Sequence, residues 1–101
     1  MKNIEVADDL LSRGLGLIGR KDWGRYEGLL IKDTNAIHTF FVLFPIDVVF
    51  LDKDFQIVQV VENLRPFWIS PIVWKAKHVL ELPAGIVKKK ALGIGEKINL
   101  I

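Results

Sequence analysis

One run of sixteen residues, 37–52, holds the densest group of apolar side chains in this chain and restricts how it can fold. Pro45 and Asp47 interrupt the run, and it is shorter than the roughly 18 to 20 apolar residues that a membrane-spanning helix needs. Residues 46–51 are apolar except at Asp47, a pattern typical of a strand covered on both faces. The run therefore predicts a core segment, with Pro45 at the start of a central strand, where its missing N–H costs least.

Asp47 needs a partner, because an ionised carboxylate among apolar neighbours is costly to bury unless it is hydrogen-bonded or paired with a cation. The candidate partners are Arg13, Arg20, His38 and Thr39. Two interpretations stay open. In the first, Asp47 anchors the core through an arginine or through backbone N–H groups. In the second, it is a carboxylate whose perturbed pKa serves chemistry or a metal.

Length and composition indicate a single globular domain over residues 1–101, with 50% hydrophobic and 26% charged residues. The absence of cysteine excludes disulfides, thiol nucleophiles and thiolate metal sites. The first nine residues carry an acidic patch where a signal peptide would need an apolar stretch, so we expect a cytoplasmic protein. The net charge of +2 argues against a nucleic-acid partner, because three adjacent lysines at 88–90 are usually a solvated helix face.

The pattern along the chain predicts several short strands separated by turns. Strands are expected over 2–6, 28–32, 46–51, 56–62, 77–82 and 97–101, with a short edge strand at the end of 65–74. Short helices are expected over 10–18 and from Pro83 to Lys90 or Leu92, with Gly93 as a C-terminal cap. Phe55 lies where a tight turn would prefer glycine, so a longer turn based on type I should join the central hairpin. These elements predict a mainly β fold, a compact antiparallel β-sandwich or barrel with one or two short helices.

Residues 14–19 match the pattern G-x-G-x-x-G of dinucleotide-binding folds. That motif works only where an apolar strand leads into a long helix, whose N-terminal N–H groups hold the pyrophosphate. Here a charged segment precedes the glycines and the following residues are a poor helix opening. We therefore do not expect nucleotide binding.

The segment 65–74 holds two prolines and three aromatic residues, Phe67, Trp68 and Trp74. If these side chains point outward, they could stack on a sugar ring, a base or a protein partner. The alternative is that they close one end of a barrel.

Residues that could support catalysis or metal binding are few. His38 and His78 could join Asp47 in a two-histidine, one-carboxylate metal site, although a lone histidine beside an apolar run is usually structural. Neither serine lies in a Gly-x-Ser-x-Gly motif. Glu81 and Asp52 have the pattern of strand-edge or turn residues, so no acid–base pair is evident.

Four segments resemble the DUF192 family, a bacterial and archaeal domain of unknown function. They are Gly16–Arg20 with Arg13 upstream, Glu27–Leu30, His38–Phe41 followed by Phe44–Asp52, and Val79–Gly85. The resemblance as a whole extends from residue 13 to about residue 98. The chain departs from the usual family pattern at Leu15, Val42-Leu43 and Phe55. The resemblance implies a compact β fold and no particular activity, and some relatives carry export signals.

The sequence thus favours a non-catalytic module that binds a protein or a small ligand. Its candidate binding residues are Arg13, Arg20, His38, Thr39, Asp47, Phe67, Trp68 and Trp74. The alternative is a small enzyme or metal-binding protein that uses His38, Asp47 and an arginine. No cofactor and no membrane span is predicted, and the oligomeric state stays open.

Overall fold

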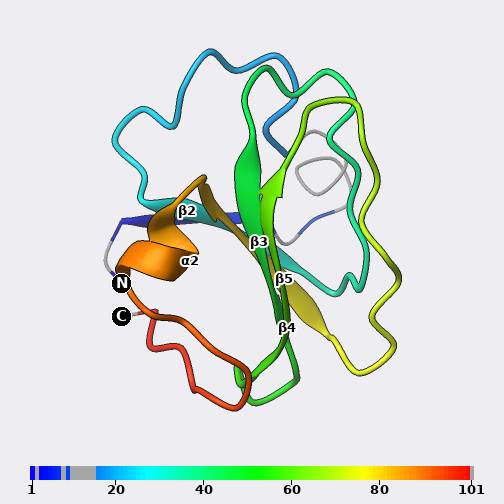
Figure 1. Ribbon diagram of the computed structural model, residues 1–101, viewed down its shortest axis with the longest axis vertical. Coiled ribbons are helices and arrows are strands. Elements are labelled where there is room, and N and C mark those ends of the chain that lie inside the picture. Colours follow the sequence, from blue (N-terminus) through cyan, green and yellow to red (C-terminus); the bar gives the residue numbers. More distant parts are fainter. Residues whose placement is uncertain (2, 8, 10–15, 101) are drawn as a thin grey trace.

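The structure, a computed structural model, describes residues 1, 3–7, 9 and 16–100. Over these residues the chain forms one five-stranded sheet and one short helix (Figure 1). The elements are β1 (Ile4–Ala7), β2 (Gly28–Lys32), β3 (Ile46–Leu51), β4 (Ile57–Leu64), β5 (His78–Pro83) and α2 (Ile86–Lys89). The strand order β1-β2-β5-β3-β4 confirms the mainly β class predicted from the sequence.

Strand β3 lies inside the sheet and is buried along its whole length. It pairs antiparallel with β4 on one side and with β5 on the other, so that Val49 lies between Val60 and Leu80. A strand covered on both faces has no solvent side, which is why its residues are apolar rather than alternating. The predicted central strand is therefore confirmed.

The expected antiparallel arrangement is wrong at one edge of the sheet. Strand β1 pairs with β2 in parallel, with Ile4 opposite Gly28 and Ala7 opposite Ile31. Parallel neighbours need a crossover of about a dozen residues or more, and residues 8–27 separate these two strands. The predicted edge strand exists, but the long connection lets it enter the sheet in the opposite direction.

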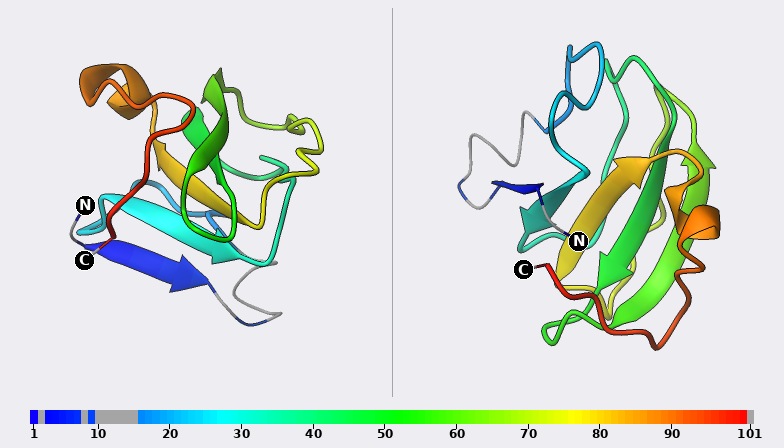
Figure 2. Two further views of the ribbon diagram at one scale, coloured as in Figure 1. Left: turned by 90° about the horizontal axis from the view of Figure 1, so that it is seen from below. Right: turned by 90° about the vertical axis from the view of Figure 1, so that its left-hand side faces the viewer.

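Each face of the sheet carries its own apolar cluster. On one face Leu80, Leu82 and Val49 pack with Val87 of α2 and with Ile98 of the C-terminal segment. The other face is covered by loops, chiefly residues 16–26, 35–44 and 65–77, as the two views of Figure 2 show together with Figure 1. This second cluster comprises Ala7, Leu17, Leu29, Ile31, Val42, Ile46, Val48, Phe50, Leu64 and Val79.

Several predicted elements differ from the structure at the C-terminal end. Pro83 is the last residue of β5, and α2 begins only at Ile86, because Gly85 adopts a left-handed conformation (φ 97°) that separates strand from helix. The left-handed residue after the helix is Ala91 (φ 52°) and not the predicted Gly93. The predicted strand 97–101 is reduced over its described residues to a single bridge between Lys97 and Gln56.

Of two other predicted elements, one is absent from the structure and one lies mostly outside the described residues. Residues 65–74 form no strand and make one isolated bridge, between Ile69 and His38. Most of the predicted helix 10–18 lies outside the described residues. Within the part of the chain that the structure describes, no helix is long and apolar enough to cross a membrane.

The turn between β3 and β4 has the predicted longer form. The Asp52 carbonyl accepts a hydrogen bond from the Phe55 N–H, and Oδ1 of Asp52 accepts from the N–H groups of Asp54 and Gln56. Phe55 itself is left-handed (φ 62°). One aspartate thus fixes a turn that otherwise would favour glycine at its last position.

Gly28 is expected to be essential for packing at the junction of β1, β2 and β5. A Cβ atom at this position would lie 2.7 Å from Cδ2 of Leu82 and 2.8 Å from the carbonyl oxygen of Glu81. Gly28→Ala should therefore lower the free energy of unfolding by about 1–3 kcal/mol through overpacking, measured by chemical denaturation.

Gly93→Ala is the matched control, because nothing lies within 4 Å of its added Cβ. It should change stability by less than about 0.5 kcal/mol. Equal stability of the two variants would contradict the proposed crowding at Gly28.

Candidate functional site

The carboxylate of Asp47 is buried and accepts hydrogen bonds from three backbone N–H groups. Oδ1 accepts from Asn63 at 2.9 Å, and Oδ2 accepts from Gly85 at 3.0 Å and from Val87 at 2.9 Å. These bonds join β3 to the end of β4 and to the start of α2. The expectation that Asp47 has hydrogen-bond partners is confirmed, and the partners are backbone groups, as a structural anchor requires.

The described side chains considered as partners of Asp47 have other contacts. Arg20 binds Glu5 of β1 through two hydrogen bonds, at 2.6 and 3.0 Å. His38 is exposed, and its ring stacks on that of Phe40. Arg13 lies outside the described residues. The structure therefore does not bring Asp47, His38 and Arg20 into one site.

The two histidines and Asp47 do not form a metal site. Asp47 lies opposite Leu82, whereas His78 lies opposite Leu51, four residues further along β3, which is a separation of about 13 Å. The Nδ1 atom of His78 accepts the Asp33 N–H at 3.1 Å, and burial lowers the pKa of this imidazole. Among the described residues no group of three or more histidine, cysteine or acidic side chains could hold a metal ion.

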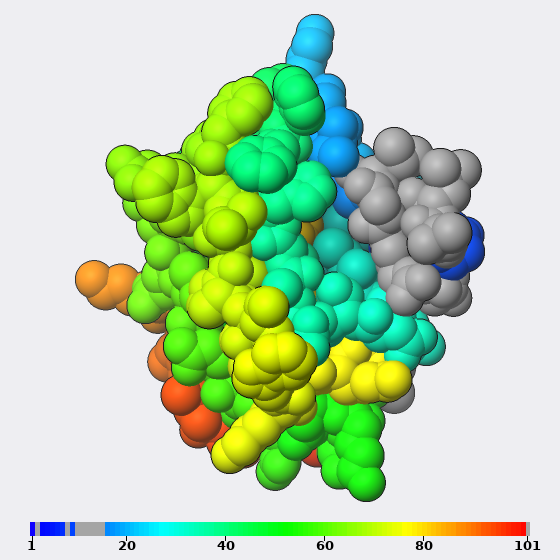
Figure 3. Space-filling view, turned by 90° about the vertical axis from the view of Figure 1, so that its right-hand side faces the viewer, coloured from blue at the N-terminus to red at the C-terminus, as the bar shows by residue number. Residues whose placement is uncertain are grey.

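The most unusual feature of the surface is a group of exposed apolar side chains on residues 35–44 and 65–77. These two segments lie side by side and occupy much of the face seen in Figure 3. The exposed fractions of these apolar residues run from 42% to 82%, and that of Trp74 is the highest. We define the aromatic surface as Phe40, Phe41, Leu43, Phe67, Trp68, Ile69, Ile72 and Trp74.

A buried threonine positions the aromatic surface. Thr39 donates its N–H to the Trp68 carbonyl at 2.7 Å, and its own carbonyl accepts the Phe67 N–H at 2.8 Å. Its hydroxyl accepts the Trp68 N–H at 2.8 Å and donates to the Arg65 carbonyl. Three predicted binding residues, Thr39, Phe67 and Trp68, are therefore brought together, with Thr39 beneath the other two.

A buried serine repeats this arrangement further along the two segments. The Ser70 hydroxyl accepts the Ile37 N–H at 2.9 Å, and the Ser70 N–H donates to the Ile37 carbonyl at 2.9 Å. The Val73 N–H then donates to the Asn35 carbonyl at 2.9 Å. Two hydroxyl groups thus hold both segments in register where no continuous strand ladder exists, which makes the surface preorganised.

Two residues of the aromatic surface adopt a backbone conformation that bulky side chains rarely take. Phe41 has φ 64° and Phe67 has φ 58°. Their rings make an edge-to-face contact at 5.5 Å, and both residues remain more than half exposed. A left-handed phenylalanine costs on the order of 1–3 kcal/mol, and less than half of each residue is buried in compensation. Packing in the core of the monomer therefore does not explain why a bulky phenylalanine occupies each of these two strained positions.

The sequence did not reveal the full extent of this surface. Phe40, Phe41 and Leu43 were predicted to lie in the core segment, but the structure exposes them. Within residues 37–44, which precede Pro45, the buried residues are Thr39 and Val42. The polar Thr39 within an apolar run was the one available signal that this part of the run is not a regular buried strand.

Glu81 is a second residue whose position differs from the sequence-based expectation. It lies in β5, an interior strand, and is 4% exposed instead of lying at a strand edge. Pairing aligns Glu5, Leu29 and Glu81 across three strands, which places them on one face of the sheet. Burial raises the pKa of Glu81 to about 8, although the charge of Arg20 acts in the opposite direction.

The ion pair beside Glu81 favours the charged forms of both of its members, whereas burial favours the neutral form of Glu81. The guanidinium of Arg20 hydrogen-bonds to Glu5 and holds the pKa of that carboxyl below its usual range, and Glu5 raises the pKa of Arg20. Arg20 is thereby fixed over β1. Its predicted binding role stays a prediction.

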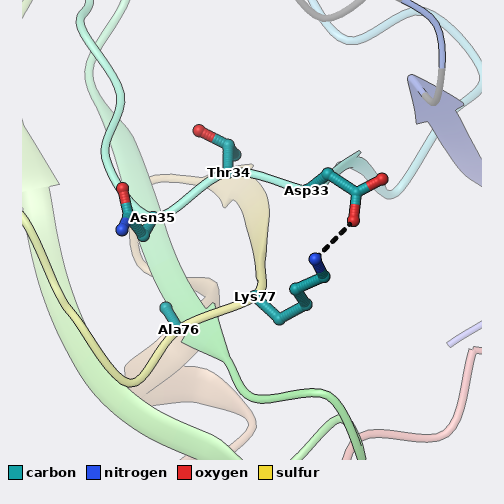
Figure 4. A pocket seen from close by; sticks show the side chains of 5 residues that line it. All are labelled: Asp33, Thr34, Asn35, Ala76 and Lys77. Atoms are coloured by element: carbon teal, nitrogen blue, oxygen red, sulfur yellow. Dashed lines mark ion pairs between the residues drawn. The ribbon is translucent and has the colours of Figure 1, made fainter.

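Two pockets contribute little to a catalytic interpretation. A shallow polar one of ≈ 300 Å³ lies where β2 ends and β5 begins, with Lys77 paired to Asp33 at 3.1 Å (Figure 4). Its other lining residues are Thr34, Asn35 and Ala76. A more apolar pocket of ≈ 440 Å³ is lined by Phe55, Lys97, Ile98, Asn99 and Leu100. Neither contains a nucleophile beside a base.

Comparison with known proteins gives a family but no activity. The model of the DUF192 family, described as "Uncharacterized ACR", matches residues 1–100. The chain is 34% identical over 99 residues to the UPF0127 protein PH1112 of Pyrococcus horikoshii, covering 95% of this chain and 85% of that protein. It is 35% identical over 101 residues to the UPF0127 protein PYRAB11210 of Pyrococcus abyssi, covering 97% and 86%.

Two crystal structures share the fold. A protein of unknown function from Novosphingobium aromaticivorans superposes with a TM-score of 0.84 at 22% identity, over 95% of this chain and 73% of that one. A protein described as a "putative transcription regulator" from Sinorhizobium meliloti gives a TM-score of 0.82 at 28% identity, over 93% and 78%. These similarities support the fold described above.

Replacement of Asp47 should test its role as an anchor. In Asp47→Asn an amide NH₂ must face at least one backbone N–H that the carboxylate now satisfies, so the free energy of unfolding should fall by about 2–4 kcal/mol. Asp52→Asn is the control, because a single oxygen accepts both of its hydrogen bonds and an amide oxygen can replace it. Its cost should stay below about 1 kcal/mol. A stable Asp47→Asn protein would refute the anchor.

Glu81 should make stability depend on pH. Its folded pKa of about 8 exceeds the ordinary 4.5, so the folded state holds a proton that the unfolded state releases, and stability falls as pH rises from about 4.5 to 8. Glu81→Gln stays neutral and should flatten this part of a pH series of melting temperatures, with its largest gain over the parent protein above pH 8. The exposed Glu62→Gln should leave the profile unchanged. An equal gain for Glu81→Gln at all pH values would exclude this proton uptake.

Proposed function

We infer that this chain, which belongs to the DUF192 family, is a non-catalytic binding module whose binding site is the aromatic surface. The observation that carries the proposal is the pair Phe41 and Phe67. Each combines an unfavourable left-handed backbone with an exposed phenyl ring. Residues that break local rules without benefit to the monomer are expected at functional sites.

The composition of the surface supports the same function. Interfaces concentrate their binding energy in aromatic residues and arginine, and the guanidinium of Arg65 lies 4.8 Å over the Trp68 ring. This contact and the hydrogen bonds of Thr39 fix the Trp68 side chain and backbone before any partner arrives. Binding by a preorganised surface loses less conformational entropy than binding by mobile loops.

A small enzyme or metal-binding protein is less well supported. Both oxygens of Asp47 are occupied by backbone N–H groups, and Arg20 is held by Glu5. Asp47 and Arg20 are therefore both held away from the surface-exposed His38. The described residues therefore offer this alternative no assembled set of catalytic groups.

Nucleic-acid binding is raised only by the description of the Sinorhizobium protein as a transcription regulator. In this chain Lys88 and Lys89 belong to α2, which packs on the face of the sheet opposite to the loops that carry the aromatic surface. The lysines of α2 therefore do not extend the few cations beside the aromatic surface into the continuous basic face that a nucleic-acid site needs. We therefore do not propose this function.

Site-specific photo-crosslinking in the host should test the binding surface. Trp74 replaced by p-benzoylphenylalanine should give adducts on irradiation, because its side chain is 82% exposed within the surface. The matched control is the same replacement at Ile94, which is 71% exposed on the C-terminal segment that covers the other face. Adducts should form at Trp74 and be absent at Ile94.

A second change separates binding from folding. Phe67→Asn introduces a residue that tolerates the left-handed backbone, so the melting temperature should not fall while the Trp74 adducts are lost. Adducts that form equally at both positions, or that persist in Phe67→Asn, would refute the aromatic surface as the binding site.

A further inference from the structure

The charged residues of the two segments that carry the aromatic surface all have the same sign. The two segments 35–44 and 65–77 contain Arg65, Lys75 and Lys77 and no aspartate or glutamate. Lys77 is paired with Asp33 at the edge, whereas Arg65 and Lys75 are exposed beside the apolar side chains. A partner for this surface is therefore anionic where it meets the cations and apolar where it meets the rings.

Part of the backbone beneath the surface is hydrogen-bonded without a partner. The N–H groups of the two segments donate to acceptors within the segments themselves at residues Ile37, Thr39, Phe40, Val42, Phe67, Trp68, Ser70 and Val73. Pro66 and Pro71 have no N–H to satisfy. A protein interface usually adds a hydrogen bond for roughly every 100–200 Å², but a lipid interior can supply none. Internal satisfaction of these donors is what burial in lipid requires.

The side chains also match the layers of a membrane surface. Tryptophan rings prefer the interface between headgroups and acyl chains, while phenylalanine and isoleucine side chains favour the acyl region. The cations Arg65 and Lys75 would then lie at headgroup phosphates. The exposed side chains of this surface project from two loop segments, as side chains that insert into a membrane interface would.

We propose that the aromatic surface binds the interface of a membrane that contains anionic lipids. The proposal rests on the binding function inferred above and names its partner. Together with the cytoplasmic location expected from the sequence, it places the protein at the cytoplasmic leaflet, whose anionic lipids attract basic residues. No spanning segment is involved, because attachment uses loop side chains only.

Vesicle flotation tests the proposal with defined lipids. The full chain should float with large unilamellar vesicles of phosphatidylcholine containing about 30% phosphatidylglycerol, and at least about tenfold less with phosphatidylcholine alone or at high salt. Emission from tryptophan should shift to shorter wavelength on binding. Trp68→Ala combined with Trp74→Ala should weaken partition at least about tenfold, as should Arg65→Gln combined with Lys75→Gln. Ile94→Ala, at an exposed apolar residue on the other face, should float like the parent protein.

The outcomes separate this proposal from the binding function itself. Each variant is first compared with the parent by circular dichroism and thermal unfolding, and Phe67→Asn provides a further surface variant that keeps its backbone geometry. No flotation, with protein adducts at Trp74, would overturn membrane binding and leave a protein-binding module. No flotation and no adducts would overturn both proposals. Flotation that the tryptophan variants do not reduce would refute the aromatic surface as the membrane site.

Discussion

The fold depends on one carboxylate that replaces part of a regular hydrogen-bond network. Asp47 lies on the buried strand β3, and its three hydrogen bonds reach Asn63 near the end of β4, Gly85 just after β5 and Val87 in α2. At Asn63 the backbone is left-handed and the β3–β4 register shifts, and at Gly85 the chain leaves β5 for α2. Without the carboxylate these N–H groups would lose their acceptor, and at the buried Val87 an unsatisfied donor would cost about 1–3 kcal/mol. A single side chain thus ties the ends of β4 and β5 and the start of α2 to the central strand.

The same device recurs on the opposite face with neutral groups. Thr39 and Ser70 join loop segments that have only one isolated bridge between them. Side-chain oxygens can satisfy backbone donors where the spacing of a ladder is lost. The protein therefore presents apolar side chains on irregular backbone that is nevertheless ordered. This combination makes an exposed aromatic group useful for recognition.

The sequence predicted the sheet far better than it predicted the surface. Strands β2 and β3 follow from apolar runs bounded by turn residues, and their bounds agree with the structure. The direction of β1 could not be predicted, because strand periodicity is the same in parallel and antiparallel pairs. The short length of α2 depends on the left-handed Gly85, a backbone state that the residue type permits but does not require.

The candidate site was less predictable for a physical reason. An apolar run has the same composition whether its rings enter a core or face the solvent, so Phe40, Phe41 and Leu43 were assigned to the core together with the strand that follows. Trp68 and Trp74 were recognised as possible surface residues because prolines interrupt their segment. The burial of Glu81 depends on its strand having neighbours on both sides, which is a property of the topology and not of the local sequence.

The left-handed conformation at residues 41 and 67 also provides a way to sort related chains. In a chain that no longer needs the surface, random substitution would favour glycine or asparagine at these two positions, because both relieve the backbone and remove an exposed ring. In a chain that still uses it, a large apolar side chain would persist there despite its conformational cost. The residue types at these two positions would then divide the family into binders and non-binders without any knowledge of the ligand.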